Sequence, residues 1–125
     1  DVYDLTEAQW SIVQEAIDLY KECAPIIKLG RNYRFGEPVK SYNHLKGWQA
    51  VCRKSEAGNR MLVVVHTFEE CNGNVTITLP DESEASYKVM QCFGREGVEA
   101  GITNNQLLVK NLEVYDGVVC LLERI

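Results

Sequence analysis

Between Thr6 and Leu29, hydrophobic residues recur every three or four positions, which is the spacing of one face of an α-helix. One row on this face comprises Trp10, Val13, Ile17, Tyr20, Ala24 and Ile27, and a second row beside it comprises Ile12, Ala16, Leu19, Cys23 and Ile26. So broad an apolar arc favours more than one neighbour for the helix. We expect the edge around Ile12, Leu19 and Ile26 to remain exposed or to pair with another copy of the chain.

The start of this helix has a specific signal. Thr6 is followed three residues later by Gln9, the pattern of a capping box in which each side chain bonds the backbone N–H of the other. Leu5 and Trp10 occupy the two positions of a hydrophobic staple around that cap. The pattern therefore predicts a helix that begins directly after Thr6.

Two residues near the end of the helical pattern interrupt it. Pro25 lacks a backbone donor and crowds the preceding turn, which predicts a kink or a restart near residues 22–24. Gly30 follows the last apolar position of the pattern, and glycine commonly ends helices in the left-handed conformation. We therefore expect the helix to end at a left-handed Gly30.

After Gly30 the hydrophobic period falls from 3.6 to about two, and turn residues such as glycine, asparagine and proline separate the apolar runs. Strands are predicted at residues 32–35, 48–53, 60–68, 74–79, 86–93, 98–102, 106–110 and 117–123. Only residues 37–47 resemble a long loop. The sequence thus predicts a mostly β protein, an antiparallel β-sandwich of Greek-key type with about seven to eight strands. One long N-terminal helix, residues 1–30, precedes the sandwich domain, residues 31–125.

Two of the predicted strands are apolar on both faces. Residues 60–68 place Leu62 and Val64 on one face and Met61, Val63 and Val65 on the other; residues 117–123 follow the same pattern. A sheet with one face in water would alternate apolar with polar residues. We therefore expect both strands to be central, covered by the second sheet on one side and by the helix or a neighbouring domain on the other.

The charge pattern excludes some classes of partner. There are 13 Lys and Arg against 18 Asp and Glu, a net charge of −5, and no block of basic residues. Nucleic acid is not an expected partner, because phosphate binding requires a basic stripe. No apolar run approaches the roughly 20 residues that span a bilayer, and the first residues carry no signal-peptide pattern. A membrane is therefore not an expected partner either.

The five cysteines are Cys23, Cys52, Cys71, Cys92 and Cys120, and no two of them form a C-x-x-C pair. This spacing does not favour a zinc site. Cys52, Cys92 and Cys120 lie in apolar strands, where a free thiol behaves as a small hydrophobe. We expect five free thiols and a reducing compartment, the cytoplasm being the simplest one.

No nucleophile elbow, P-loop, dinucleotide-binding or zinc-protease motif occurs in the chain. His44 and His66 stand alone, and His66 shares a strand face with apolar residues, which favours a structural histidine. The acidic pairs of a glycosidase lie about 5 to 10 Å apart around the scissile bond. Glu69 and Glu70, like the acidic cluster at residues 81–84, lie at loops and are interpreted as solvated turn charges. No catalytic, cofactor-binding or metal-binding residue is predicted.

Two weaker binding signals remain. Residues 74–76 read NVT, a formal glycosylation triplet that falls in a predicted strand. Trp48, Tyr33, Tyr42 and Tyr115 are candidates for an aromatic platform that stacks on sugar rings. Aromatic residues at strand ends more often pack in the core or in hairpins, and that interpretation is favoured here.

The segment 10–35, WSIVQEAIDLYKECAPIIKLGRNYRF, resembles the junction between the catalytic barrel and the C-terminal domain of α-galactosidases and their relatives. The most telling parts are LYK at 19–21, PII at 25–27, Gly30 and Tyr33. Downstream, the tryptophan-led GWQAV at 47–51 and the closing YDGVVCLLE at 115–123 also look similar to that family. The closing strand resembles α-amylase and α-glucosidase sandwiches as well.

This resemblance implies the non-catalytic C-terminal part of an α-galactosidase-like glycoside hydrolase whose role is to brace the barrel. The parent reaction would be the hydrolysis of terminal α-galactosides. The family's catalytic residues are aspartates at the ends of barrel strands, and a barrel needs roughly 250 residues, so none is carried over to this chain. The implied partner is the missing barrel, with another copy of the chain as a second candidate for the helix face. A free-standing carbohydrate-binding module and a protein-interaction sandwich are the alternatives.

Overall fold

The computed structural model describes residues 6–36, 47–80 and 86–125, apart from the side chains of residues 12, 29 and 32. The described residues form one helix followed by strands. In chain order these elements are α1 (Glu7–Leu29), β1 (Arg31–Gly36), β2 (Trp48–Lys54), β3 (Arg60–Thr67), β4 (Val75–Thr78), β5 (Tyr87–Phe93), β6 (Glu99–Thr103), β7 (Gln106–Lys110) and β8 (Gly117–Arg124). Each described strand corresponds to a predicted one, with ends that differ by at most a residue or two. The predicted long loop lies outside the described residues except for Gly47.

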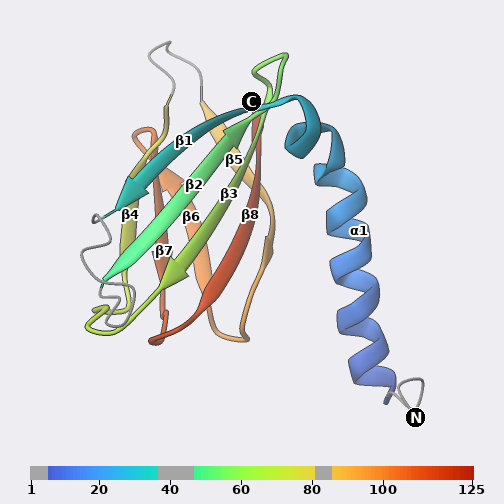
Figure 1. The fold of residues 1–125 in the computed structure, drawn as a ribbon, viewed down its shortest axis with the longest axis vertical. Coiled ribbons are helices and arrows are strands. Elements are labelled where there is room, and N and C mark those ends of the chain that lie inside the picture. Colours follow the sequence, from blue (N-terminus) through green and yellow to red (C-terminus); the bar gives the residue numbers. More distant parts are fainter. Residues whose placement is uncertain (1–5, 37–46, 81–85) are drawn as a thin grey trace.

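The strands form two antiparallel sheets, one with the order β1-β2-β3-β8-β5 and one with the order β4-β7-β6. Figure 1 shows the smaller sheet behind the larger one and α1 standing beside the larger sheet. The chain passes from one sheet to the other between β3 and β4, β4 and β5, β5 and β6, and β7 and β8. The predicted class, a mostly β antiparallel sandwich after one long helix, is confirmed.

The inner faces of the two sheets form the main core. Fully buried side chains come from the larger sheet, including Met61, Val63, Val65, Val118, Cys120 and Leu122, and from the smaller one, including Val75, Ile77, Leu107 and Val109. β3 is the middle strand of the larger sheet and β8 lies beside it. The prediction that the two doubly apolar strands are central is confirmed.

A second, smaller core lies on the outer face of the larger sheet. Leu19, Cys23 and Ile26 of α1 pack against Leu62 of β3 and Leu121 of β8. Val64, Phe93 and Val119 are half-buried around this cluster. The helix therefore covers the part of the outer face around Leu62 and Leu121, as the hydrophobic pattern predicted, and leaves Val64 and Val119 half-buried.

The capping box at the start of α1 is present as predicted. The backbone N–H of Gln9 donates to Thr6 Oγ1 at 3.1 Å, and the backbone N–H of Thr6 donates to Gln9 Oε1 at 2.8 Å. Two of the otherwise unpaired donors of the first turn are thereby satisfied. The predicted staple involves Leu5, which lies outside the described residues.

The end of α1 differs from the prediction in two respects. The helix continues unbroken through Pro25, so the predicted restart does not occur. Gly30 has φ −78° and ψ 173°, which is extended backbone, so the prediction of a left-handed cap is wrong. The chain enters β1 directly, and glycine is required there by space. A Cβ atom at Gly30 would lie 2.4 Å from the carbonyl oxygen of Ile26 and 2.5 Å from that of Lys54.

Candidate interaction surface on the helix

The helix presents an apolar row to solvent. This row, called the α1 stripe, consists of Trp10, Val13, Ile17, Tyr20, Ala24 and Ile27. The side chains of Trp10, Ile17, Tyr20 and Ile27 are 48%, 42%, 66% and 44% exposed, and those of Val13 and Ala24 are half-buried. Its members alternate spacings of three and four residues, the pattern of a seam that packs on another surface. A contiguous apolar row of this kind is typical of an interaction site.

The predicted orientation of the helix is therefore wrong. Leu19 is 6% and Ile26 2% exposed, although the edge they belong to was expected to remain free; the side chain of Ile12 lies outside the described residues. The buried row is aliphatic and contains the small Cys23, which lets the helix approach the sheet closely. Trp10 and Tyr20 carry an N–H and an O–H that need partners when buried. They are more stable on the side that faces solvent.

Polar contacts fix the second half of α1 to the larger sheet. Arg60 Nη1 lies 2.9 Å from Glu22 Oε2, and Arg53 Nε donates to the carbonyl oxygen of Ile26 at 2.9 Å. The second contact is an additional hydrogen bond to a carbonyl that already accepts from the backbone N–H of Gly30, in the last turn of the helix where cations are favoured. The exposed Glu22 pair contributes only a few tenths of a kcal/mol up to about 1 kcal/mol. In Figure 1 the first turns of α1 stand away from the sheet.

A polar groove lies on another side of the helix. Asp18, Lys21, Glu22 and Pro25 of α1 line it together with Arg60 and Gln91 of the sheet, and its volume is about 610 Å³. Charged residues of both signs line this groove, which gives it no preference for one sign of charge. The helix therefore has three distinct faces: one packed on the sheet, one polar, and the exposed α1 stripe.

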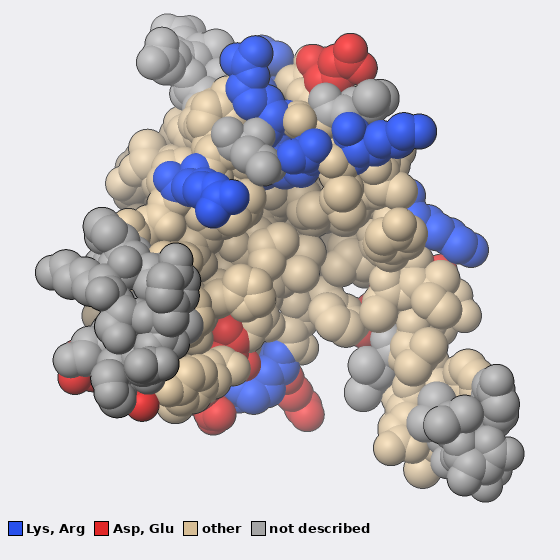
Figure 2. Space-filling model, viewed as in Figure 1, with Lys and Arg blue, Asp and Glu red and all other residues tan. Residues whose placement is uncertain are grey.

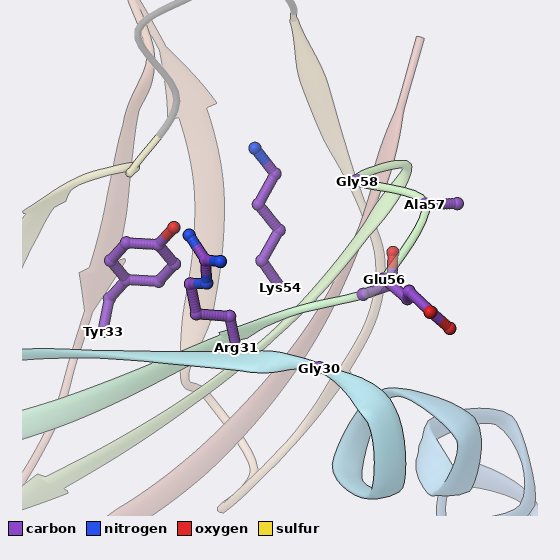
Figure 3. Close-up of a pocket in the computed structure, with 8 residues that line it drawn as sticks. Gly30, Arg31, Tyr33, Lys54, Glu56, Ala57 and Gly58 are labelled. Atoms are coloured by element: carbon purple, nitrogen blue, oxygen red, sulfur yellow. The ribbon is translucent and has the colours of Figure 1, made fainter.

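A second hollow lies where α1 joins β1, with a volume of about 550 Å³ (Figure 3). Its lining includes Gly30, Arg31, Tyr33, Lys54 and the turn 55–58. Arg31 and Lys54 are register partners in β1 and β2, and Figure 3 shows both side chains and the Tyr33 hydroxyl pointing the same way. Figure 2 shows Lys and Arg side chains gathered at this end of the sandwich. The lining also includes the acidic Glu56, and Lys54 already has an interaction within the chain.

The titratable residues considered from the sequence do not form a reactive site in the described parts of the chain. His66 is exposed and its imidazole lies over Gly117, rather than in an apolar packing position. Glu69 and Glu70 are exposed turn charges; Tyr115 Oη donates to Glu69 Oε1 at 3.0 Å, and this hydrogen bond raises the pKa of Tyr115. His44 and the cluster 81–84 lie outside the described residues. Within the described ranges no group of His, Cys, Asp or Glu is suited to a metal ion.

The aromatic candidates do not form a platform in the described structure. Tyr33 and Trp48 are half-buried and pack against the main core, whereas Tyr115 is exposed and its hydroxyl is paired with Glu69. Tyr42 lies outside the described residues. In the formal glycosylation triplet, Thr76 is exposed in β4. The favoured interpretation of these aromatics as packing residues agrees with the positions of Tyr33 and Trp48.

We expect galactose at millimolar concentration to leave the fluorescence of Trp48 unchanged, because its indole packs against the core instead of forming a free stacking face. Since Trp10 is the other tryptophan of the chain, the titration uses a Trp10→Phe background in which all tryptophan fluorescence comes from Trp48. A saturable fluorescence response, together with a binding heat in calorimetry that disappears in Trp48→Ala, would instead support the carbohydrate-binding module.

A scan against protein-family models finds no match, and neither the curated proteins nor the solved structures contain a significant match to this chain. No helix in the described ranges has the length and apolarity needed to cross a bilayer.

The sequence pattern located the helix and its apolar arc but could not separate the arc into a buried row and an exposed row. It also gave no signal for the hollow at Arg31 and Lys54, because these residues become neighbours only through strand register. The α1 stripe is the feature of the described structure that fits a binding role best.

Proposed function

We propose that this chain is a non-catalytic β-sandwich domain that docks through the α1 stripe on the (β/α)8 barrel of an α-galactosidase-like glycoside hydrolase. The observation that carries the proposal is that α1 has two apolar rows, of which only one is used by its own sandwich. A late barrel helix would be expected to have such a second face, because it packs against the barrel as well as against the domain that follows.

The resemblance of residues 10–35 and 115–123 to that family supports the choice of partner. The parent would hydrolyse terminal α-galactosides with residues of the barrel, and this domain would brace the barrel without contributing a reacting group. A reducing, cytoplasmic location fits a chain with five unpaired thiols.

The test is binding of the full chain to an α-galactosidase barrel expressed without the late helix that corresponds to α1 and without its own C-terminal domain, measured by calorimetry. We expect Ile17→Lys to weaken binding at least about tenfold, because burial of one large apolar side chain contributes roughly 1.5 to 3 kcal/mol and 1.4 kcal/mol is a factor of ten. The matched control is Ser11→Lys, which adds the same charge at an exposed position outside the stripe. It should bind like the unmodified chain.

Two outcomes would contradict the proposal. One is an affinity that Ile17→Lys and Ser11→Lys lower equally, since that would make the stripe irrelevant. The other is a stable dimer of the chain alone that Ile17→Lys dissociates, which would assign the stripe to self-association. Aryl α-galactoside hydrolysis should be absent for the chain alone and should follow the barrel in the mixture.

A further inference from the structure

Cysteine sulfurs meet on the inner face of the larger sheet. The strand register places Cys52, Val63, Cys120 and Cys92 in one row across β2, β3, β8 and β5. Cys92 and Cys120 are direct cross-strand partners, and Cys120 Sγ donates to Cys92 Sγ at 3.9 Å. Among the described cysteines this is the one pair whose sulfurs hydrogen-bond each other.

The backbone geometry at this pair suits a covalent link. Directly opposed residues of antiparallel strands have Cα atoms about 4.5 to 5.5 Å apart, which lies within the range of about 4.4 to 6.8 Å that disulfides span. The two sulfurs must approach from 3.9 Å to about 2.05 Å. Rotation of the two side chains provides most of this movement. The register also shifts between Val89 and Gln91, so β5 has a bulge close to Cys92 that can absorb the remainder.

Cys92 is the member of the pair that a solute can reach. β5 is an edge strand of the larger sheet, and Cys92 is half-buried whereas Cys120 is fully buried. The hydrogen bond from Cys120 stabilises the Cys92 thiolate and lowers the pKa of Cys92 to about 7, although burial opposes this. The same hydrogen bond, together with burial, raises the pKa of Cys120. Cys92 is therefore the nucleophile, and Cys120 is the resolving cysteine that can react with Cys92 once Cys92 is oxidised.

We propose that Cys92 and Cys120 form a reversible intrachain disulfide when the protein meets a peroxide. The Cys92 thiolate attacks one oxygen of hydrogen peroxide, an S–O bond forms and the O–O bond breaks, so that Cys92 becomes a sulfenic acid; the departing hydroxide takes up the proton that the Cys92 thiol had released and leaves as the first water. Cys120 sulfur then attacks the Cys92 sulfur, the S–O bond breaks, and the Cys120 proton leaves with the hydroxide as the second water. Two thiols lose two electrons and the peroxide gains them. A dithiol reductant reverses the reaction.

The other described cysteines lack this arrangement. Cys52 donates to the Met61 sulfur at 3.6 Å, and burial raises the pKa of Cys52 to about 12. Cys23 is buried beneath α1, and burial raises its pKa as well. Cys71 is half-buried in the connection after β3 and hydrogen-bonds no other described cysteine. The reaction should therefore be confined to one pair.

The experiment uses the full chain, reduced and then freed of reductant. Titration with a thiol reagent under denaturing conditions should give five thiols before treatment with a small excess of hydrogen peroxide and three after it. The mass should fall by two hydrogens, and proteolytic mapping should link the peptides that contain Cys92 and Cys120. Dithiothreitol should restore all five thiols. Because the mapping uses the unmodified chain, its result does not depend on the folding of any variant.

The matched variants are Cys92→Ala and Cys71→Ala. Each should begin with four thiols; Cys71→Ala should lose two on peroxide treatment, whereas Cys92→Ala should form no intrachain disulfide. The proposal is overturned if the unmodified chain retains five thiols, if Cys92 accumulates as sulfinic acid with Cys120 still reduced, or if the mapped disulfide joins two chains.

Discussion

A chain that begins at Arg31 is expected to be insoluble or only partly folded, because removal of α1 uncovers the outer face of the larger sheet. In the intact protein Leu62 and Leu121 are almost fully buried by Leu19 and Ile26 of the helix. Without the helix, both leucines and the half-buried side chains around them would face water. An apolar patch on two central strands is a site for aggregation.

The expected loss is large in relation to the stability of a small domain. Burial of a large apolar side chain contributes roughly 1.5 to 3 kcal/mol. The four large side chains of this contact, Leu19, Ile26, Leu62 and Leu121, therefore contribute roughly 6 to 12 kcal/mol as an upper estimate. Domains of this size have a total free energy of unfolding of about 5 to 15 kcal/mol. The sandwich alone should therefore retain little or no stability. Circular dichroism with thermal melting, together with light scattering, measures the difference between the two chains.

A point-variant comparison separates packing from other effects of the deletion. Ile26 is 2% exposed and its neighbour Ile27 is 44% exposed, so the same isoleucine-to-alanine change can be made on the packed face and on the α1 stripe. Ile26→Ala should lower the free energy of unfolding by about 2 to 5 kcal/mol, and Ile27→Ala by no more than about 0.5 kcal/mol.

A truncated chain that is monomeric and melts as cooperatively as the intact one would contradict the first prediction, because it would show that the sandwich folds without α1.

The order of elements followed from the sequence because local chemistry determines it. The capping box at Thr6 and Gln9 is a contact between neighbours in the chain, and the change of period after Gly30 separates helix from strands. The doubly apolar strands also indicated their central position and their cover. In these cases the residues that carry the signal are the residues that make the contacts.

The rotation of α1 could not be obtained in the same way. Both rows of its apolar arc have helical spacing, so periodicity alone does not say which one faces the sheet. The choice depends on the surface formed by Leu62 and Leu121 and on the close approach that Cys23 permits. The sequence pattern therefore predicts the exposed edge of the helix around Leu19 and Ile26, whereas the exposed row is the α1 stripe.

The hollow at Arg31 and the sulfur pair at Cys92 depend on strand register. Arg31 meets Lys54, and Cys92 meets Cys120, only because β1 pairs with β2 and β5 pairs with β8 at particular offsets. The β5–β8 offset includes a bulge after Val89, which no turn residue or periodicity in the sequence indicates. The sequence showed where each strand lies but not which residues of distant strands would be opposite each other.

Gly30 shows how a correct boundary can have a different cause from the expected one, and its replacement by alanine should have a large effect. The backbone at Gly30 is extended, and alanine adopts that conformation freely. The added Cβ, however, would lie 2.4 and 2.5 Å from two backbone carbonyl oxygens and 3.0 Å from the Cγ of Arg53. The helix end and β2 would have to separate, so Gly30→Ala should lower the free energy of unfolding by about 3 kcal/mol.

Urea denaturation of two further variants distinguishes this steric cause from a conformational one. Gly101→Ala in β6 is the matched control, because a Cβ there meets nothing within 4 Å, and its free energy of unfolding should stay within about 0.5 kcal/mol of that of the unmodified chain. Gly30→Asn decides the cause: asparagine tolerates the left-handed conformation but adds the same Cβ as alanine. We expect Gly30→Asn to be at least as destabilised as Gly30→Ala. If asparagine restored most of the stability, the left-handed cap would be the correct explanation and the close approach of the two carbonyls would not.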